Sequence, residues 1–312
     1  MRYKITPFLC LLAIGCFGQR KSVQKPDVEL MVLGTVQDAG SPHIGCQKVC
    51  CAELFEHPDN KRKVVSLGLV DYETQQTFLF EATPDMPAQL KMLKRFSEVP
   101  NEIPNGIFLT HAHIGHYTGL MYLGKEAMGA KETKVYAMPK MKKFLETNGP
   151  WSQLVALNNI SITELNHAQN FQLTKNLSIV PFTVPHRDEF SETVGFEIIG
   201  PQRSLLFIPD IDKWSKWQTA IEDKLQKVDF AFLDATFFDN SEIDNRNISE
   251  IPHPFVVESI KLFDDMPAHE KSKIHFIHFN HTNPLLNIES QQAQKVLEKG
   301  YQIAMIGQVI GL

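Results

Sequence analysis

The sequence predicts an α/β sandwich folded as one domain. Short apolar runs typical of strands occur in both halves of the chain, and segments with helical spacing of apolar residues lie between them. The 312 residues are 43% hydrophobic and 21% charged, which is enough to bury one large core or two modest ones. We find no repeat at a fixed period and no low-complexity segment.

The strands are predicted at apolar runs, most of which end near Gly, Pro, Asn or Asp. In chain order these runs span residues 29–36, 64–71, 76–81, 106–110, 133–137, 160–164, 177–184, 194–199, 204–208, 229–233, 273–277 and 302–306. Turn-like residues separate 64–71 from 76–81, and 194–199 from 204–208, so we expect each pair to form an antiparallel hairpin.

The helices are predicted where apolar residues recur every three or four positions. These segments span residues 86–96, 120–130, 139–148, 214–225, 254–262 and 290–299. Because they alternate with the strands, we expect them to pack on the faces of the sheets.

Residues 1–16 have the pattern of a signal peptide. Arg2 and Lys4 precede an apolar stretch that is too short to span a membrane comfortably. The segment LAIGC, residues 12–16, resembles a bacterial lipobox, in which Cys16 would carry the lipid. Plain secretion with cleavage nearby and an uncleaved short anchor are the alternatives.

Residues 17–27 are polar without periodicity and predict a tether to a domain formed by residues 28–312. We therefore expect an exported protein, periplasmic or attached to a membrane only through an N-terminal lipid. The net charge of −5 and the absence of a long Lys/Arg run argue against nucleic acid as a partner. The expected partner is a small-molecule substrate.

Three cysteines remain once the leader is set aside, namely Cys46, Cys50 and Cys51. An odd number of thiols does not suggest a disulfide framework. The spacing C-x3-C-C, with His43 and His57 nearby, is compatible with a structural Zn2+ held by thiolates and an imidazole. The alternative is one buried cysteine and two incidental ones.

The stretch THAHIGHYTGL, residues 110–120, places three histidines directly after the apolar run GIFL. His111, His113 and His116 are close enough in sequence to point toward one metal ion where the backbone turns at the end of a strand. The alternative is a histidine-rich surface loop.

Polar residues also follow other predicted strands. The full set after strand ends is Asp85, His111, His113, His116, His186, Asp210 and His281. Loops at one end of a scaffold are where sites are built, so we expect these side chains to form one site.

This arrangement resembles the metallo-β-lactamase superfamily, whose pattern is an early Asp, H-x-H-x-D-H, a lone His, a lone Asp and a final His. It is most similar to the branch of pyrroloquinoline quinone (PQQ) biosynthesis protein B. The stretches that carry the likeness are LGTVQDAGSPHIGC (33–46), FEATPD (80–85), FLDATFF (232–238), EIPHPFVVES (250–259) and IHFNHTNP (277–284). The resemblance extends from about residue 29 to the C-terminus. It implies a four-layer αββα sandwich with two mixed sheets and a zinc knuckle at the cysteines.

The resemblance also implies a role for each candidate residue. The first metal site would be held by His111, His113 and His186, with Asp210 bridging and His116 and His281 at a second site. Asp85 would orient a ligand imidazole, cap the following helix, or do both. Asp212 competes with Asp210 for its role, and we assign His278 to the strand.

One departure from the family pattern concerns the second metal ion. The residue before the third histidine is normally an Asp, and here it is Gly115. Two ions that share few anionic ligands repel each other. We therefore expect one tightly bound catalytic ion and a second that is weak, supplemented by water or absent.

A single Zn2+ held by imidazoles and a carboxylate can activate water for hydrolysis of an ester, amide, lactone or phosphodiester. Asp210 would orient the nucleophile or act as general base, and His116 or His281 would stabilise the oxyanion. His253 could reach the pocket, although we interpret it as part of a rigid turn. The alternatives are a redox or oxygenase-like enzyme with iron, and a non-catalytic envelope lipoprotein that uses the same scaffold for binding.

Overall fold

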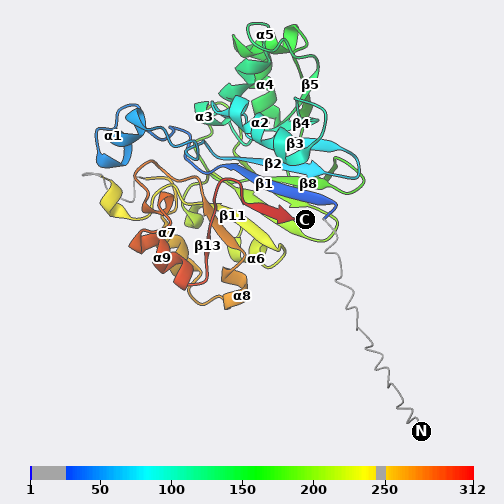
Figure 1. Cartoon of the computed structure of the whole chain (residues 1–312). Helices are drawn as coiled ribbons and strands as arrows, with labels where there is room; N and C mark the ends of the chain where they lie inside the picture. Colours follow the sequence, from blue (N-terminus) through cyan, green and yellow to red (C-terminus); the bar gives the residue numbers. More distant parts are fainter. Residues whose placement is uncertain (2–25, 244–250) are drawn as a thin grey trace.

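The computed structural model describes residue 1, residues 26–243 and residues 251–312 (Figure 1). The predicted signal peptide and almost all of the predicted tether lie outside the described residues, so both stay predictions. Within the part that is described, no helix combines the length and the apolar character needed to cross a membrane.

The first sheet has seven strands in the order β14-β1-β2-β3-β4-β5-β6. Their bounds are β1 (Val28–Gly34), β2 (Ser66–Asp71), β3 (Gln76–Phe80), β4 (Gly106–Phe108), β5 (Thr133–Ala137), β6 (Ile160–Glu164) and β14 (Val309–Gly311). Strands β14, β1, β2 and β3 pair antiparallel, whereas β3 to β6 pair parallel. This sheet is therefore mixed.

The second sheet also has seven strands, in the order β13-β12-β11-β10-β9-β8-β7. Their bounds are β7 (Phe171–Gln172), β8 (Ser178–Thr183), β9 (Val194–Ile199), β10 (Ser204–Ile208), β11 (Phe230–Asp234), β12 (Ile274–Ile277) and β13 (Gln302–Ile303). Strands β7 to β10 pair antiparallel and β10 to β13 pair parallel. Both predicted hairpins, β2–β3 and β9–β10, are confirmed.

The two sheets pack face to face through aromatic side chains. Phe80 of the first sheet contacts Phe196 and Phe207 of the second, with ring centroids 5.3 Å and 6.2 Å apart. Such edge-to-face contacts between fully buried rings are typical of a close-packed interior. The central core of the protein therefore lies between the sheets.

Helices cover the outer face of each sheet, as Figure 1 shows. On the first sheet these are α2 (Met86–Ser97), α4 (Pro139–Thr147) and α5 (Trp151–Ala156), and on the second they are α6 (Ile221–Leu225), α7 (Val256–Leu262) and α9 (Gln291–Glu298). A short α8 (Ala268–Lys271) precedes β12. The predicted four-layer αββα sandwich with two mixed sheets is confirmed.

Two predicted helices differ in detail. Residues 120–130 do not form an α-helix: the first four belong to the 3-10 helix η1 (Thr118–Leu123), which follows the short α3 (Ile114–Tyr117), and the rest form turns. Segment 214–225 is divided into η2 (Trp214–Lys216) and α6, because the backbone is extended at Trp217. The helix α1 (Val49–Glu56) was not predicted, since Cys51 is its only buried side chain and it has no apolar stripe.

Candidate metal centre

The candidate ligands leave the two sheets at strands that end on the same side of the sandwich. The three histidines of the 110–120 stretch follow β4, His186 follows β8, and Asp210 follows β10. Neighbouring loops at one end of a sandwich bring side chains from distant parts of the sequence together. The ligand atoms of His111, His113, His186 and Asp210 all lie within 4.8 Å of one another.

Asp210 lies at the centre of this group. Its Oδ2 is 3.3 Å from His111 Nε2 and 3.2 Å from His186 Nε2. The same oxygen is 3.8 Å from His116 Nε2 and 3.9 Å from His113 Nδ1. One nitrogen of each of these four rings therefore faces a shared space around one carboxylate.

The other ring nitrogen of two of these histidines is held by an oxygen. His111 Nδ1 lies 2.8 Å from Thr110 Oγ1, and His186 Nδ1 lies 3.1 Å from Asp212 Oδ1. Metal-binding histidines are usually oriented in this way, because an N–H on the outer nitrogen leaves a lone pair on the inner one. Asp212 thus contacts the outer nitrogen of His186. Asp210, and not Asp212, is the carboxylate that lies among the histidines.

His116 has a similar partner, but it is not the one that the sequence suggested. Its Nδ1 lies 3.4 Å from Glu81 Oε2, and both side chains are fully buried. Asp85, which we expected to orient a ligand imidazole, instead accepts a hydrogen bond of 2.8 Å from the backbone N–H of Val64. The predicted role of Asp85 at the ligands was therefore wrong. Asp85 does occupy the N-cap position of α2, but its side chain forms no cap hydrogen bond there.

The charge states of two central residues, His111 and Asp210, suit metal binding. Burial, together with the charge of nearby His116, lowers the pKa of His111 well below its ordinary value and keeps its ring neutral. Burial alone would raise the pKa of Asp210, but the charges of His253 and His186 hold that pKa well below its usual range. Neutral imidazole and ionised carboxylate are the forms in which these groups bind metals.

The unpaired atoms of the site also fit a cation. Buried ring nitrogens without a hydrogen-bond partner include His111 Nε2, His116 Nε2 and His278 Nε2. Leaving a buried polar atom unpaired costs about 1–3 kcal/mol, and a bound cation would offset this cost. Imidazoles with a carboxylate are a ligand set that suits zinc and also iron. This geometry supports a metal ion at the site.

A second group adjoins the first through Asp210. It contains Asp234 and two histidines that we had placed elsewhere, His253 and His278. His253 Nδ1 lies 3.1 Å from Asp210 Oδ1 and 2.9 Å from Asp234 Oδ2, so His253 faces the site instead of serving only a turn. Strand β12 ends before His278, whose Nδ1 lies 2.9 Å from Thr236 Oγ1, so the assignment of His278 to the strand was also wrong.

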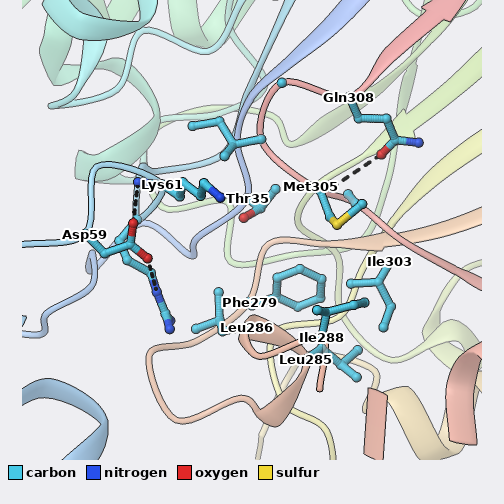
Figure 2. Close-up of a pocket in the computed structure, with 14 residues that line it drawn as sticks. Thr35, Asp59, Lys61, Phe279, Leu285, Leu286, Ile288, Ile303, Met305 and Gln308 are labelled. Carbon is cyan, nitrogen blue, oxygen red and sulfur yellow. Dashed lines mark hydrogen bonds and ion pairs between the residues drawn. The ribbon is translucent and has the colours of Figure 1, made fainter. Parts of the chain in front are cut away.

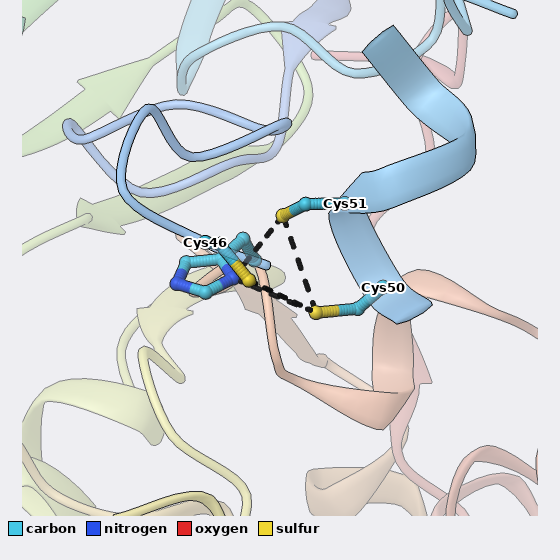
Figure 3. Close-up of side chains that lie close together, drawn as sticks. Cys46, Cys50 and Cys51 are labelled. Atoms are coloured by element: carbon cyan, nitrogen blue, oxygen red, sulfur yellow. Dashed lines mark hydrogen bonds between the residues drawn. The ribbon is translucent and has the colours of Figure 1, made fainter. Parts of the chain in front are cut away.

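His281 lies outside this centre, which corrects its predicted role at a second catalytic metal. The ring instead approaches the three cysteines, with His281 Nδ1 3.4 Å from Cys51 Sγ and 3.7 Å from Cys50 Sγ. The thiols themselves converge (Figure 3), with 3.7 Å between Cys46 and Cys50 and 4.0 Å between Cys50 and Cys51. Ligands about 2.0–2.3 Å from a tetrahedral zinc lie roughly 3.3–3.8 Å apart. His281 therefore has the geometry of a fourth knuckle ligand.

The electrostatics of this cysteine group point the same way. Burial and the hydrogen bond with the Cys46 thiol raise the pKa of Cys50 to about 12. Thiols this close cannot all ionise unless a cation compensates their charge. Burial and the nearby charges of His43 and Lys48 lower the pKa of His281, which leaves its ring neutral.

A pocket elsewhere is not part of either group. It measures about 470 Å³ and lies near Phe279, Met305 and Gln308 (Figure 2). None of the candidate metal ligands lines it. A shallower pocket of about 350 Å³ adjoins the centre, because its lining residue Glu189 places Oε2 3.5 Å from His113 Nε2.

The residues that sequence reasoning missed share one signal. Glu81 and Asp234 lie at or directly after the end of a strand, as the predicted ligands do. Glu81 and His278 directly follow β3 and β12, and both have positive φ angles, 74° and 67°. A non-glycine residue in this conformation is uncommon and is enriched at functional sites.

Comparison with known proteins agrees with this geometry. The family model described as "Beta-lactamase superfamily domain" matches residues 76–276. Coenzyme PQQ synthesis protein B of Xanthomonas oryzae pv. oryzae is 22% identical over 312 residues, which cover 91% of this chain and 100% of that protein.

Two solved structures have a similar fold. The Zn2+-bound PqqB from Methylobacterium extorquens has a TM-score of 0.74 at 20% identity, covering 91% of this chain and all of that one. A diphosphatase from the PhnP family has a TM-score of 0.63 at 20% identity, covering 91% of this chain and 96% of that one. The chain belongs to the β-lactamase superfamily, has the metallo-β-lactamase fold and fits the PqqB-like branch of that fold.

Proposed function

We propose that this protein is a metal-dependent hydrolase whose centre is built on His111, His113, His186 and Asp210. One observation carries the proposal: four imidazole nitrogens face one buried carboxylate oxygen at 3.2–3.9 Å. A metal ion held by these residues would lower the pKa of water from 15.7 to about 7 and so make a nucleophile available near neutral pH. Asp210 stays ionised and orients the attacking water.

His253 is suited to protonate the leaving group. Burial alone would lower its pKa, but the carboxylates of Asp234 and Asp210 raise it well above the ordinary value. A ring that holds its proton beside the reacting centre can transfer that proton as a bond breaks, which typically accelerates a reaction by about 10²–10⁴-fold. Asp234, which is fully buried, positions the ring from behind.

The substrate reaches the centre through the 350 Å³ pocket that includes Glu189. Its lining combines two cationic side chains, Lys140 and Lys143, two carboxylates, Asp188 and Glu189, and two aromatic rings, Phe144 and Phe190. The rings lie 5.6 Å apart between centroids, and Phe190 is exposed. A small ester, amide, lactone or phosphodiester with an apolar group suits the rings, and the mixed charges of the lining do not select a substrate by its net charge.

Hydrolysis of a defined set of esters tests the proposal. The full chain, freed of metal and then supplied with Zn2+, is offered bis(p-nitrophenyl) phosphate, p-nitrophenyl esters of dicarboxylic acids, and aliphatic lactones. We expect turnover of at least one class, and a loss of about 10²-fold or more in His113→Ala, which removes a ligand. Equal turnover in the two proteins, or none across the set, contradicts the proposal.

The role of His253 has its own readout. The variant His253→Gln should be slowed much more on substrates with poor leaving groups, such as alkyl esters, than on p-nitrophenyl esters, whose leaving group needs no proton. The variant Asp265→Asn changes an exposed carboxylate in the turn after α7 and serves as the control. If the loss in His253→Gln is the same for both kinds of leaving group, His253 does not act as the proton donor.

A role in the synthesis of a quinone cofactor is the second candidate. Its support is that the relatives called coenzyme PQQ synthesis protein B align over nearly the whole chain. Histidine-rich centres also suit iron, which is used in redox and oxygenase-like chemistry. Metal analysis combined with absorption spectra separates the candidates, because zinc is spectroscopically silent and iron is not.

We also propose that Cys46, Cys50, Cys51 and His281 bind a structural Zn2+. The support is the match of their spacings to a tetrahedral site. All four positions are filled by protein atoms, which is typical of a structural ion.

A further inference from the structure

We propose that Asp38 supplies the carboxylate that position 115 lacks, and that Asp38, His116 and His278 hold a second metal ion next to Asp210. The inference rests on the proposed metal-dependent function and adds a ligand from another part of the chain. Its basis is a close approach between two loops and a steric relation between residues 38 and 115.

The loop that carries Asp38 runs beside the loop that carries His278. The backbone N–H of Gln37 donates to the carbonyl of Phe279 at 2.8 Å, and the N–H of Phe279 donates to the carbonyl of Thr35 at 2.8 Å. Val36 also forms a parallel bridge with Phe279. These bonds fix the residue after His278 against the residues before Asp38.

Three ligand atoms meet where these loops approach α3. The donor atoms of Asp38, His116 and His278 all lie within 4.8 Å of one another. Both imidazoles are fully buried, and their Nε2 atoms have no hydrogen-bond partner. Their Nδ1 atoms face oxygens of Glu81 and Thr236. Each ring therefore has its inner nitrogen available for a ligand, as in the first metal group.

Gly115 explains how Asp38 can occupy this place. A Cβ built at position 115 would contact the Cβ of Asp38 and would lie 2.5 Å from its backbone oxygen and 2.6 Å from its Cα. Gly115 is within the helix α3, whose backbone any residue can adopt, so space and not conformation requires glycine here. A side chain at position 115 and the loop at Asp38 exclude each other.

The charge of the second site changes accordingly. An ion beside only His116, His278 and the shared Asp210 would be repelled by the first ion with little compensation. An additional carboxylate from Asp38 restores an anionic ligand to the second ion. The amide of Gln37 donates to Asp38 Oδ1 and orients the carboxylate. We therefore expect two ions at the centre and a third at the knuckle.

Zinc titration of the full chain against a competing chelator tests this assignment. Wild-type protein should bind three Zn2+. In Asp38→Ala and in Asp38→Asn, the weakest of the three should lose affinity by about 100-fold, because even a partner that only orients a ligand is worth roughly 10–100-fold. Asp59→Ala removes an exposed carboxylate from the same connection between β1 and β2 and should bind like wild type.

Gly115→Ala provides an independent variant, because it removes no ligand atom. The added methyl group should displace the Asp38 loop and weaken the same ion, while circular dichroism and the other two ions report an intact fold. Unchanged binding of three ions by Asp38→Ala overturns the role of Asp38 and leaves the hydrolase proposal standing. Wild-type protein that binds zinc only at the knuckle overturns both proposals.

Discussion

His281→Ala should remove the structural ion and loosen one segment while leaving the catalytic centre folded. The ring lies 3.4 Å and 3.7 Å from two of the three thiols and is remote from the four histidines around Asp210. Three thiols without a fourth ligand form a weaker zinc site. The expected loss is therefore one ion per chain.

The loosening of residues 37–63 should be large because this segment buries few side chains. Among residues 37–63, only Ser41 and Cys51 are buried, whereas Ile44 and Val49 are 92% and 85% exposed. Burying one side chain contributes about 1.5–3 kcal/mol, but ordering each backbone residue costs roughly 1–2 kcal/mol. The 8 residues of α1 thus need another source of stability. A zinc ion at about 1,000 times its Kd contributes about 4.1 kcal/mol.

Hydrogen exchange measures this contribution. The amides of Ala52 and His57 donate within α1, at 3.1 Å and 2.8 Å, and should exchange about 1,000-fold faster in His281→Ala at that zinc concentration. Strands of the central core should be unchanged. His57→Ala, at an exposed histidine of the same segment, should behave as wild type.

Two results would refute this reasoning. Full zinc occupancy with slow exchange in His281→Ala would mean that the ring is not a knuckle ligand. Loss of an ion from the centre, with α1 still protected, would return His281 to the catalytic role that the sequence first suggested.

Two further predictions concern carboxylates near the centre. Although burial alone would lower it, the charge of Glu81, with smaller contributions from Asp38 and Asp210, raises the pKa of His116 to about 9 in metal-free protein. The protonated ring should stabilise the fold fully below about pH 6.5 and lose that effect as the pH rises through about 9. Glu81→Gln should reduce this pH dependence in urea unfolding. Asp85→Ala should lower the free energy of unfolding by about 1–3 kcal/mol, because the N–H of Val64 loses its acceptor, without changing zinc stoichiometry.

The sequence predicted the sandwich because most of its strands are apolar runs and residues typical of turns separate them. It failed where elements bury little: α1 has one buried side chain, and β7 has two residues. Such elements are stabilised by the residues that they contact, which for α1 are those of the cysteine group. A local sequence pattern does not reveal those contacts.

The candidate site was predictable wherever a ligand directly follows its strand. His111, His186 and Asp210 were found in this way. At two strand ends we predicted a later residue as the site residue, namely Asp85 after β3 and His281 after β12. Glu81 and His278 directly follow these two strands. The positive φ of both residues turns the chain at once, and a backbone angle cannot be read from a non-glycine sequence.

Asp38 was missed for a different reason, which also changes the meaning of Gly115. Position 115, considered alone, looked like the loss of a ligand and predicted a second ion that is weak or absent. In the structure the missing side chain is what admits the backbone of residue 38, and no local pattern links these two positions. Two loops connect proposed ligands of the second catalytic ion to residues of the cysteine group. One runs from Asp38 to Cys46, and the other runs from His278 to His281. If both proposed sites are filled, an ion at the knuckle would clamp both loops that carry ligands of the second catalytic ion. We therefore expect the cysteine group to stabilise the geometry of the centre as well as its own segment.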